Sequence, residues 1–284
     1  LWGKPSRECG AVVGSGGRFQ EDFYGDGSDG DLEVVEGFPY TLSWDMYFDN
    51  LVIGAGARLW TYGFRVYVKG KLTIGSGGRL HCDGDDATGW QGASPGAPSR
   101  TFYNLANRGQ MPAGGKGGWG GQPAGPGTVT ETPAAGGRGQ ARVRGFGPAR
   151  LLGGCGGGGG GYCGAVGGQP VSEGESVLGP NGGDGGDATN DGSSVELYGG
   201  GGGGGAGVVE VYAHEIDNAG TISADGGAGA SGEVSGACEA GAGGGGGAGA
   251  VILYYTTASG SGVGTLTADG GPTADDIVTK VIAR

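Results

Sequence analysis

Glycine dominates this sequence and lies largely in runs, which limits the folds open to the chain more than any other feature. Of the 284 residues, 78 are glycine, with unbroken runs at Gly156–Gly161, Gly199–Gly205 and Gly243–Gly247. A glycine adds no side chain to a core and costs about 1 kcal/mol in a helix interior, so we do not expect a helical bundle or a thick apolar core. Because the glycines do not occupy every third position, the chain is not collagen-like either.

Two short segments repeat 21 residues apart. The sequence Leu-Val-Ile-Gly-Ala-Gly-Ala-Arg-Leu at 51–59 returns as Leu-Thr-Ile-Gly-Ser-Gly-Gly-Arg-Leu at 72–80, and a weaker relative lies at 12–19. Alternating apolar residues predict short strands, and the Gly-x-Gly interruptions predict corners between them. A period of about 20 residues with glycine corners is typical of a parallel β-solenoid, in which stacked turns bury each other's inward side chains.

A longer unit is duplicated in the C-terminal third. In both copies a glycine run leads into an apolar strand, at 208–212 and 250–254, and then into the pattern Thr-[Ile/Leu]-[Ser/Thr]-Ala-Asp-Gly-Gly. The copies are offset by 42 to 44 residues, and 66–68 with 80–84 resembles the same unit without its glycine run. An ordered duplication of this kind predicts structural repeats rather than flexible linkers.

The glycine runs themselves have two interpretations. A pure glycine run is ordinarily a flexible tether. The alternative is polyglycine II, an extended helix with three residues per turn whose backbone groups pair with neighbouring chains. Because the runs here lead into apolar strands in register, we favour polyglycine II-like packing, in which only glycine lets the backbones approach closely.

These patterns predict an all-β protein. We expect a short-strand β-solenoid or sandwich in the N-terminal part, followed by a glycine-rich, polyglycine II-like region with strands and loops. The predicted parts are a strand-rich repeat domain at 1–84, a Gly/Pro-rich loop region with a basic segment at 85–198, and Gly-run plus strand repeats at 199–284 that pack with the preceding regions. Exposed strand edges and a thin core are compatible with a homo-oligomer.

Charge is unevenly distributed along the chain. Between Ala87 and Ser172, seven basic residues and one acid, Glu131, give a net charge of +6, whereas the rest of the chain carries −18. An acidic particle with one basic region suits an anionic partner there, although solvated loop charges or docking on an acidic neighbour are alternatives. The acidic total argues against nucleic-acid binding. No stretch approaches the ~20 apolar residues that span a bilayer, so we expect no membrane insertion.

Catalytic motifs are not evident, and we predict a protein that is not an enzyme. His81 and His214 lie in strand-like repeats, where a structural role is the simpler interpretation, and no nucleophile elbow, His-Glu-x-x-His pair or P-loop occurs. Asp83, Asp85 and Asp86 are compatible with the paired carboxylates of a glycosidase. Asp-Gly is, however, first of all a turn dipeptide.

Calcium and a disulfide are the other chemistries that the sequence offers. We expect no required cofactor, but oxygen ligands on tight turns, as Ca²⁺ needs, come from Asp26, Asp29, Asp31, Asp184 and Asp187. Neither group has EF-hand spacing, and turn formation is the alternative role. Cys155 and Cys163 flank a six-glycine run and form either a disulfide, if the backbone doubles back, or two free buried thiols.

Aromatic and basic residues of the irregular middle region are the candidates for receptor binding. They are Trp90, Arg100, Phe102, Tyr103, Arg108, Lys116 and Trp119. Aromatic faces bind sugars and apolar protein surfaces, while Arg and Lys bind carboxylate or phosphate groups. Recognition is commonly placed on loops that a rigid scaffold carries. The alternative is that these rings cap the ends of a poor core.

Several segments resemble known proteins. Gly25–Asp31, Thr41–Leu51 and Gly63–Gly70 look like the N-terminal portion of glycine-rich virion proteins of tailed phages, and Asn218–Gly227 is similar to their C-terminal repeats. The glycine runs also resemble those of the adhesins at the tips of T-even-type long tail fibres, where stacked polyglycine helices carry variable loops that touch the bacterial receptor. By that resemblance the recognition loops would be those at 85–113, 122–135, 140–152, 171–181 and 228–240.

The resemblance implies a virion-surface or extracellular protein without catalytic activity. It would be a tail-fibre or tail-tip component that contacts other virion proteins and binds a bacterial surface protein or an anionic glycan. A capsid or tail decoration, or an extracellular filament subunit with self-assembly contacts only, is the structural alternative. A β-solenoid enzyme that degrades polysaccharides is the third interpretation.

Overall fold

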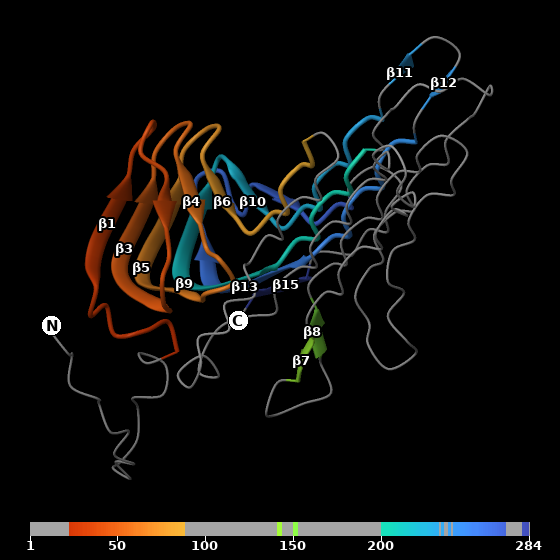
Figure 1. Cartoon of the computed structure of the whole chain (residues 1–284). Helices are drawn as coiled ribbons and strands as arrows, with labels where there is room; N and C mark the ends of the chain where they lie inside the picture. Colours follow the sequence, from red (N-terminus) through yellow and green to blue (C-terminus); the bar gives the residue numbers. More distant parts are fainter. Residues whose placement is uncertain are drawn as a thin grey trace, which may run out of the picture.

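The computed structural model describes residues 23–88, 200–232 and 241–270 in full, and the short strands at 141–143, 150–152, 234–235, 238–239 and 280–283 by their backbone. Its main strands form two sheets (Figure 1). The larger sheet has the order β1 (Gly30–Val34), β3 (Met46–Ile53), β5 (Val66–Ile74), β9 (Val208–Asn218), β13 (Ala250–Ala258) and β15 (Lys280–Ala283). The smaller sheet has the order β14 (Thr265–Thr267), β10 (Thr221–Ser223), β6 (Arg79–His81), β4 (Arg58–Trp60) and β2 (Tyr40–Thr41).

All neighbouring strands within these two sheets are parallel. The remaining strands form two antiparallel pairs, β7 (Ala141–Val143) with β8 (Arg150–Leu152), and β11 (Val234–Ser235) with β12 (Cys238–Glu239). No helix occurs in the residues that the structure describes, so the all-β prediction is confirmed for that part of the chain.

The chain alternates between the two sheets, and glycines turn the corners. β3 is followed by β4 in the smaller sheet, and β5 in the larger sheet is followed by β6. The predicted Gly-x-Gly corners lie at these crossings, where Gly56 and Gly77 have φ angles of 69° and 72°. Residues with a Cβ rarely adopt such positive φ values, which explains why glycine recurs there.

The sequence repeats pair with each other in register. Leu51 lies opposite Leu72, and Leu59 lies opposite Leu80, as their 21-residue spacing predicts. In the C-terminal copies Tyr212 lies opposite Tyr254, and Ile222 lies opposite Leu266.

The N-terminal and C-terminal repeats share both sheets. β5 pairs with β9 and β6 pairs with β10, so strands from before and after the long middle region are direct neighbours (Figure 1).

The main hydrophobic core lies between the two sheets. Both sheets contribute side chains with no more than 1% exposure, including Leu51, Leu72 and Ile216 from the larger sheet and Leu59, Leu80 and Ile222 from the smaller one. Full burial of such side chains stabilises the fold by about 1.5–3 kcal/mol each. Because inward and outward residues alternate along a strand, the neighbours of these leucines point away from the core.

A second cluster lies on the other face of the larger sheet, where four tyrosines form a continuous stack. The ring centroids of Tyr47, Tyr67, Tyr212 and Tyr254 are 4.7, 4.7 and 4.5 Å apart in that order. Phe23 contacts Tyr212 and Tyr254 edge-on, at 5.3 and 5.8 Å. The stack therefore links β3, β5, β9 and β13.

The glycine-rich segments at 82–88, 200–207, 224–230 and 241–249 are extended and hydrogen-bond to one another. Gly200, Gly203 and Ala206 donate to the carbonyls of residues 241, 244 and 247, at 2.9, 2.8 and 3.0 Å. On another side, Gly204 and Gly207 donate to residues 85 and 82, at 3.0 and 2.8 Å. Donors directed at one neighbour therefore recur at every third residue.

These backbones also lie too close together for side chains. A Cβ atom added to Gly203 would lie 2.0 Å from the carbonyl oxygen of Gly227, and one added to Gly246 would lie 2.0 Å from that of Gly204. Such distances are well inside van der Waals contact. Glycine is thus required at these positions by packing, not by backbone dihedral angles.

Candidate functional site

A groove on the outer face of the smaller sheet gathers aromatic, basic and acidic side chains. Arg58 and Trp60 flank the buried Leu59, and Arg79 and His81 flank the buried Leu80, so all four side chains point outward. The groove has a volume of about 290 Å³. It is lined by Arg58, Trp60, Arg79, His81, Asp83, Gly84, Asp85, Asp86, Asp225 and Gly226.

Three aromatic rings form a column along this face. Trp60 lies opposite His81 in the β4–β6 pair, and their rings stack with centroids 5.2 Å apart. Tyr62 stacks on Trp60 at 4.8 Å. Tyr62 has a φ of 49°, the sole positive value at a non-glycine residue in the described part of the chain. Its backbone is strained by about 1–2 kcal/mol, which the ring contact offsets.

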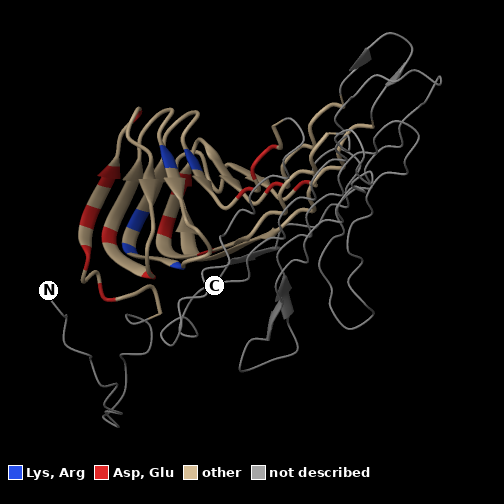
Figure 2. Cartoon of the chain, in the orientation of Figure 1, with Lys and Arg blue, Asp and Glu red and all other residues tan. Residues whose placement is uncertain are grey.

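Arg79 organises the acidic side of the groove. Its Nη2 atom lies 2.9 Å from Asp225 Oδ2 and 3.2 Å from Asp83 Oδ2. Its Nε atom donates to Ser223 Oγ at 2.9 Å. His81 Nδ1 lies 2.9 Å from Asp83 Oδ2, an ion-pair distance when the imidazole is protonated. Figure 2 shows basic residues on β4 and β6 and acidic residues in the segment that follows β6.

The acids of the groove do not share one electrostatic environment. Burial is the largest influence on the Asp83 carboxyl and would raise its pKa, but His81 and Arg79 outweigh it and hold the pKa below its ordinary value. Burial raises the pKa of Asp225, and the charge of Asp83 adds to this effect. Burial and the charges of Asp86 and Asp83 raise the pKa of Asp85.

The Asp-Gly turns link successive layers of the fold through side-chain to backbone hydrogen bonds. The Asp225 amide donates to Asp83 Oδ1 at 2.8 Å, and the Asp269 amide donates to Asp225 Oδ1 at 3.1 Å. The Ala228 amide likewise donates to Asp86 Oδ1 at 2.7 Å. Asp83 and Asp86, two of the three glycosidase candidates, therefore hold neighbouring segments in register.

Two groups in the groove remain without a side-chain partner. Within the described part of the chain, the Arg58 guanidinium makes no ion pair or hydrogen bond, and the Asp85 carboxylate accepts no hydrogen bond. The groove thus presents one unoccupied cationic donor and one unoccupied anionic acceptor beside the aromatic column.

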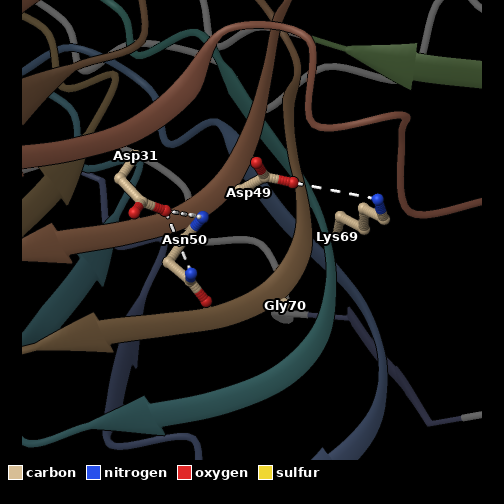
Figure 3. A pocket seen from close by; sticks show the side chains of 5 residues that line it. All are labelled: Asp31, Asp49, Asn50, Lys69 and Gly70. Carbon is tan, nitrogen blue, oxygen red and sulfur yellow. Dashed lines mark hydrogen bonds and ion pairs between the residues drawn. The ribbon is translucent and has the colours of Figure 1, made fainter.

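A second, shallower pocket lies on the larger sheet and is lined by Asp31, Asp49, Asn50, Lys69 and Gly70 (Figure 3). Asp31 Oδ1 accepts hydrogen bonds from the backbone and side-chain nitrogens of Asn50, both at 3.0 Å. Lys69 and Asp49 form an ion pair at 3.9 Å, with both side chains about half exposed. An exposed pair at this distance contributes little to stability.

The N-terminal calcium candidates hydrogen-bond to the backbone. Asp26 Oδ1 accepts from the Ser28 amide at 2.9 Å, and Asp29 Oδ2 accepts from the Tyr47 amide at 2.8 Å. Asp31 binds Asn50, as described above. Across the described ranges, no three or more His, Cys, Asp or Glu side chains are grouped as metal ligands would be.

The predicted receptor-binding residues lie outside the described residues. These are Trp90, Arg100, Phe102, Tyr103, Arg108, Lys116 and Trp119. The same holds for Asp184, Asp187 and the cysteine pair Cys155 and Cys163. Cys82 is described: it is in no disulfide with another described residue, and its side chain is fully buried.

Of the groove residues, Asp83, Asp85 and Asp86 were candidates from the sequence, whereas the basic and aromatic residues beside them were not. The residues of the groove come from 58–60, 79–86 and 225–226, and they meet because β6 pairs with β10 across the long middle region. One signal was available in the sequence. Arg58 and Arg79 occupy the same position in the 21-residue repeat, and each stands next to a leucine that the repeat predicts to be buried.

The described residues include no helix long and apolar enough to cross a membrane. Comparison with known proteins adds no relative: no family model, no curated protein and no solved structure matches this chain.

Proposed function

We propose that this chain is a non-enzymatic protein of a virion surface, a tail-fibre or tail-tip adhesin that attaches to a bacterial surface receptor. The observation that carries the proposal is the hydrogen-bonding of the glycine-rich segments at every third residue. A frame held together by backbone contacts needs few core side chains and leaves intervening segments free for recognition.

The 21-residue repeats and the glycine-rich segments have different architectures in this proposal. The paired 21-residue repeats support a β-solenoid in which each turn gives one strand to each sheet. The three-residue periodicity, and backbones closer than any side chain permits, support polyglycine II-like packing of 82–88, 200–207, 224–230 and 241–249. This combination is the one that the resemblance to polyglycine tail-fibre adhesins implies.

The middle region supplies the recognition surface in this proposal. This region connects β6 to β9, and the described segments at its two ends hydrogen-bond to each other at Gly204–Asp85 and Gly207–Cys82. The two ends of the region that includes the aromatic and basic candidates from Trp90 to Trp119 are thus joined to each other and to the paired repeats.

Immunogold electron microscopy of particles from the source lysate, with an antibody to residues 85–150, tests the proposal. Label at distal fibres or the tail tip is the expected result. Label spread over the head or tail shaft would favour decoration instead. Label on cells or filaments with no virions would contradict a virion role altogether.

A second experiment addresses the residues that bind. Replacing Trp90, Phe102 and Tyr103 by alanine should abolish attachment of the purified chain to host cells while the fold is retained. Replacing Phe38 and Trp44 by serine is the control, since these are exposed aromatic rings of the N-terminal repeats, next to the edge strand β2. Attachment that survives the triple substitution would contradict the assignment of these residues.

The alternative function, a decoration or filament subunit with self-assembly contacts only, is favoured by one observation. Val35, Phe38 and Trp44 are 48%, 76% and 58% exposed, and they lie in the connections next to the edge strands β1 and β2. Large exposed apolar side chains near strand edges are features of protein–protein contact. Loss of particle binding in the Phe38 and Trp44 variant, with cell attachment unchanged, would support that alternative.

A further inference from the structure

We propose that the groove on the smaller sheet is a binding site for a neutral oligosaccharide. The inference rests on the proposed role in surface attachment for its biological setting, and it adds a ligand class and a second contact region outside the middle loops. The site consists of Arg58 and Asp85 as polar contacts beside the ring column of Trp60 and His81.

The groove is preorganised by regular structure. Arg58, Trp60, Arg79 and His81 stand on β4 and β6, whose in-register pairing fixes the spacing between their side chains. Tyr62 and His81 stack on Trp60 and hold its indole in one orientation. A site built on strands loses little side-chain freedom when a ligand binds, which favours affinity.

Most charged groups of the groove already have a partner within it, and the two that have none are of opposite sign. Arg79 is bound by Asp83 and Asp225, and Asp86 accepts the Ala228 amide. Arg58 and Asp85 are the two groups left to meet a ligand, one a donor and the other an acceptor. A hydroxyl group both donates and accepts, so the hydroxyls of a sugar offer an acceptor to Arg58 and a donor to Asp85.

The excess of acidic residues in the groove favours a neutral ligand over an anionic one. The lining residues include two arginines and four aspartates, and the Asp85 carboxyl already experiences the charges of Asp83 and Asp86. A phosphate or carboxylate ligand would add a further negative charge to this site. A neutral, hydroxyl-rich ligand avoids that repulsion.

The aromatic column suits the same ligand. Trp60 lies between Tyr62 and His81 in the stack, so both faces of its indole are covered and the ring edge is what Trp60 offers to the groove that it lines. Ring edges carry the positive part of the aromatic quadrupole and attract oxygen atoms. A volume of about 290 Å³ is at the lower end for small-ligand sites and fits one or two sugar units of a longer chain.

The test compares two double variants of the full chain on an array of neutral oligosaccharides. The array carries glucose, galactose and N-acetylglucosamine oligomers of various lengths, with sialylated and phosphorylated glycans beside them. The groove variant is R58Q with D85N, and the control is K69Q with D49N in the other pocket. Both variants remove one positive and one negative charge, so they leave the net charge unchanged.

We expect the wild-type chain to bind neutral oligosaccharides and the groove variant to bind them at least tenfold more weakly. The control variant should stay within twofold of the wild type, and all three proteins should melt at similar temperatures. Isothermal titration with the strongest neutral oligomer on the array supplies the affinities. Retained affinity in the groove variant, a preference for acidic glycans, or no binding to any neutral oligomer would each overturn the proposal.

Failure of this inference is distinguishable from failure of the proposed function. Immunogold label at the tail tip together with no neutral-sugar binding would overturn the groove site and leave the adhesin proposal standing. Groove-dependent sugar binding by a protein found on cells or filaments without virions would do the reverse.

Discussion

Arg79 on β6 forms an ion pair with Asp225, 146 residues later in the chain, with Nη2 and Oδ2 2.9 Å apart. The contact is one of several between the N-terminal and C-terminal repeats, along with the β5–β9 and β6–β10 pairings and the stacking of Tyr67 on Tyr212. The two sets of repeats consequently form one structural unit, and disrupting the junction between them should destabilise both.

The buried ion pair at this junction provides a direct test. Arg65 Nε donates to Glu210 Oε2 at 2.9 Å, and the Glu210 side chain is fully buried. Replacing Arg65 by Met leaves a buried carboxylate without its cation, and should lower the free energy of unfolding by about 3–5 kcal/mol.

The double variant Arg65→Met with Glu210→Leu is the control for that prediction. It removes both charges, so it should recover much of the lost stability in a urea titration. Losses that simply add would show that the two residues act independently, which would contradict the role assigned to the pair.

The close packing of the glycine-rich backbones should make even a single methyl group destabilising. In Gly203→Ala, the new methyl group would lie 2.0 Å from the Gly227 carbonyl oxygen, so the backbones must separate. We expect a loss of about 3 kcal/mol or more in the free energy of unfolding. Thermal or urea unfolding followed by circular dichroism measures it.

Gly37→Ala serves as the matched control for the glycine experiment. Gly37 has a φ of 84° but no heavy atom within 4 Å of its added Cβ, so only backbone strain of about 1–2 kcal/mol applies. Equal losses in the two variants would mean that the close contact at Gly203 relaxes easily.

Alkaline pH should destabilise the fold through Cys82. Burial raises the pKa of this thiol to about 12, whereas an exposed cysteine titrates near pH 8.5. Because the folded-state pKa is the higher one, the stabilisation is fully present below about pH 8.5 and is lost as the pH rises toward 12. In urea titrations from pH 7 to 10, wild-type stability should fall more steeply than that of Cys82→Ala; parallel curves would contradict the prediction.

Acid pH should also destabilise the fold, in this case through Asp83. After the opposing effect of burial, His81 and Arg79 hold the pKa of Asp83 below its ordinary value in the folded state. Its contribution is therefore present above about pH 4 and is lost as the pH falls through the folded-state pKa. Asp83→Asn should be less stable than the wild type at pH 6, and the difference should shrink below pH 4. A difference that stays constant with pH would exclude this electrostatic contribution.

The strands and corners of the 21-residue repeat could be predicted from the sequence, because each depends on residues that are close together in the chain. Alternation of apolar residues and Gly-x-Gly corners predicted the strands and crossings around Leu51 and Leu72, and these residues pair as their spacing requires. Fold class follows from the same patterns, since a chain with so few core side chains is limited to strands and extended segments.

Long-range pairing was harder to predict. Tyr67 and Tyr212 pair although they are far apart in the sequence, and the sign of this register was the similarity of 66–68 with 80–84 to the C-terminal unit. The recurrence of Tyr47, Tyr67, Tyr212 and Tyr254 at matching repeat positions was a signal for the stack. The groove combines residues from three separate stretches of sequence, so it became visible only when β6 and β10 were placed side by side.

The hydrogen bonds of Gly204 to Asp85 and of Gly207 to Cys82 also bear on how such a protein can vary. Both bonds join backbone groups, so neither depends on which side chain stands at position 85 or 82. The Asp85 side chain is exposed, and a substitution there can change the chemistry of the surface while the hydrogen bond from Gly204 is kept. Surface properties can therefore change at such positions without a new fold.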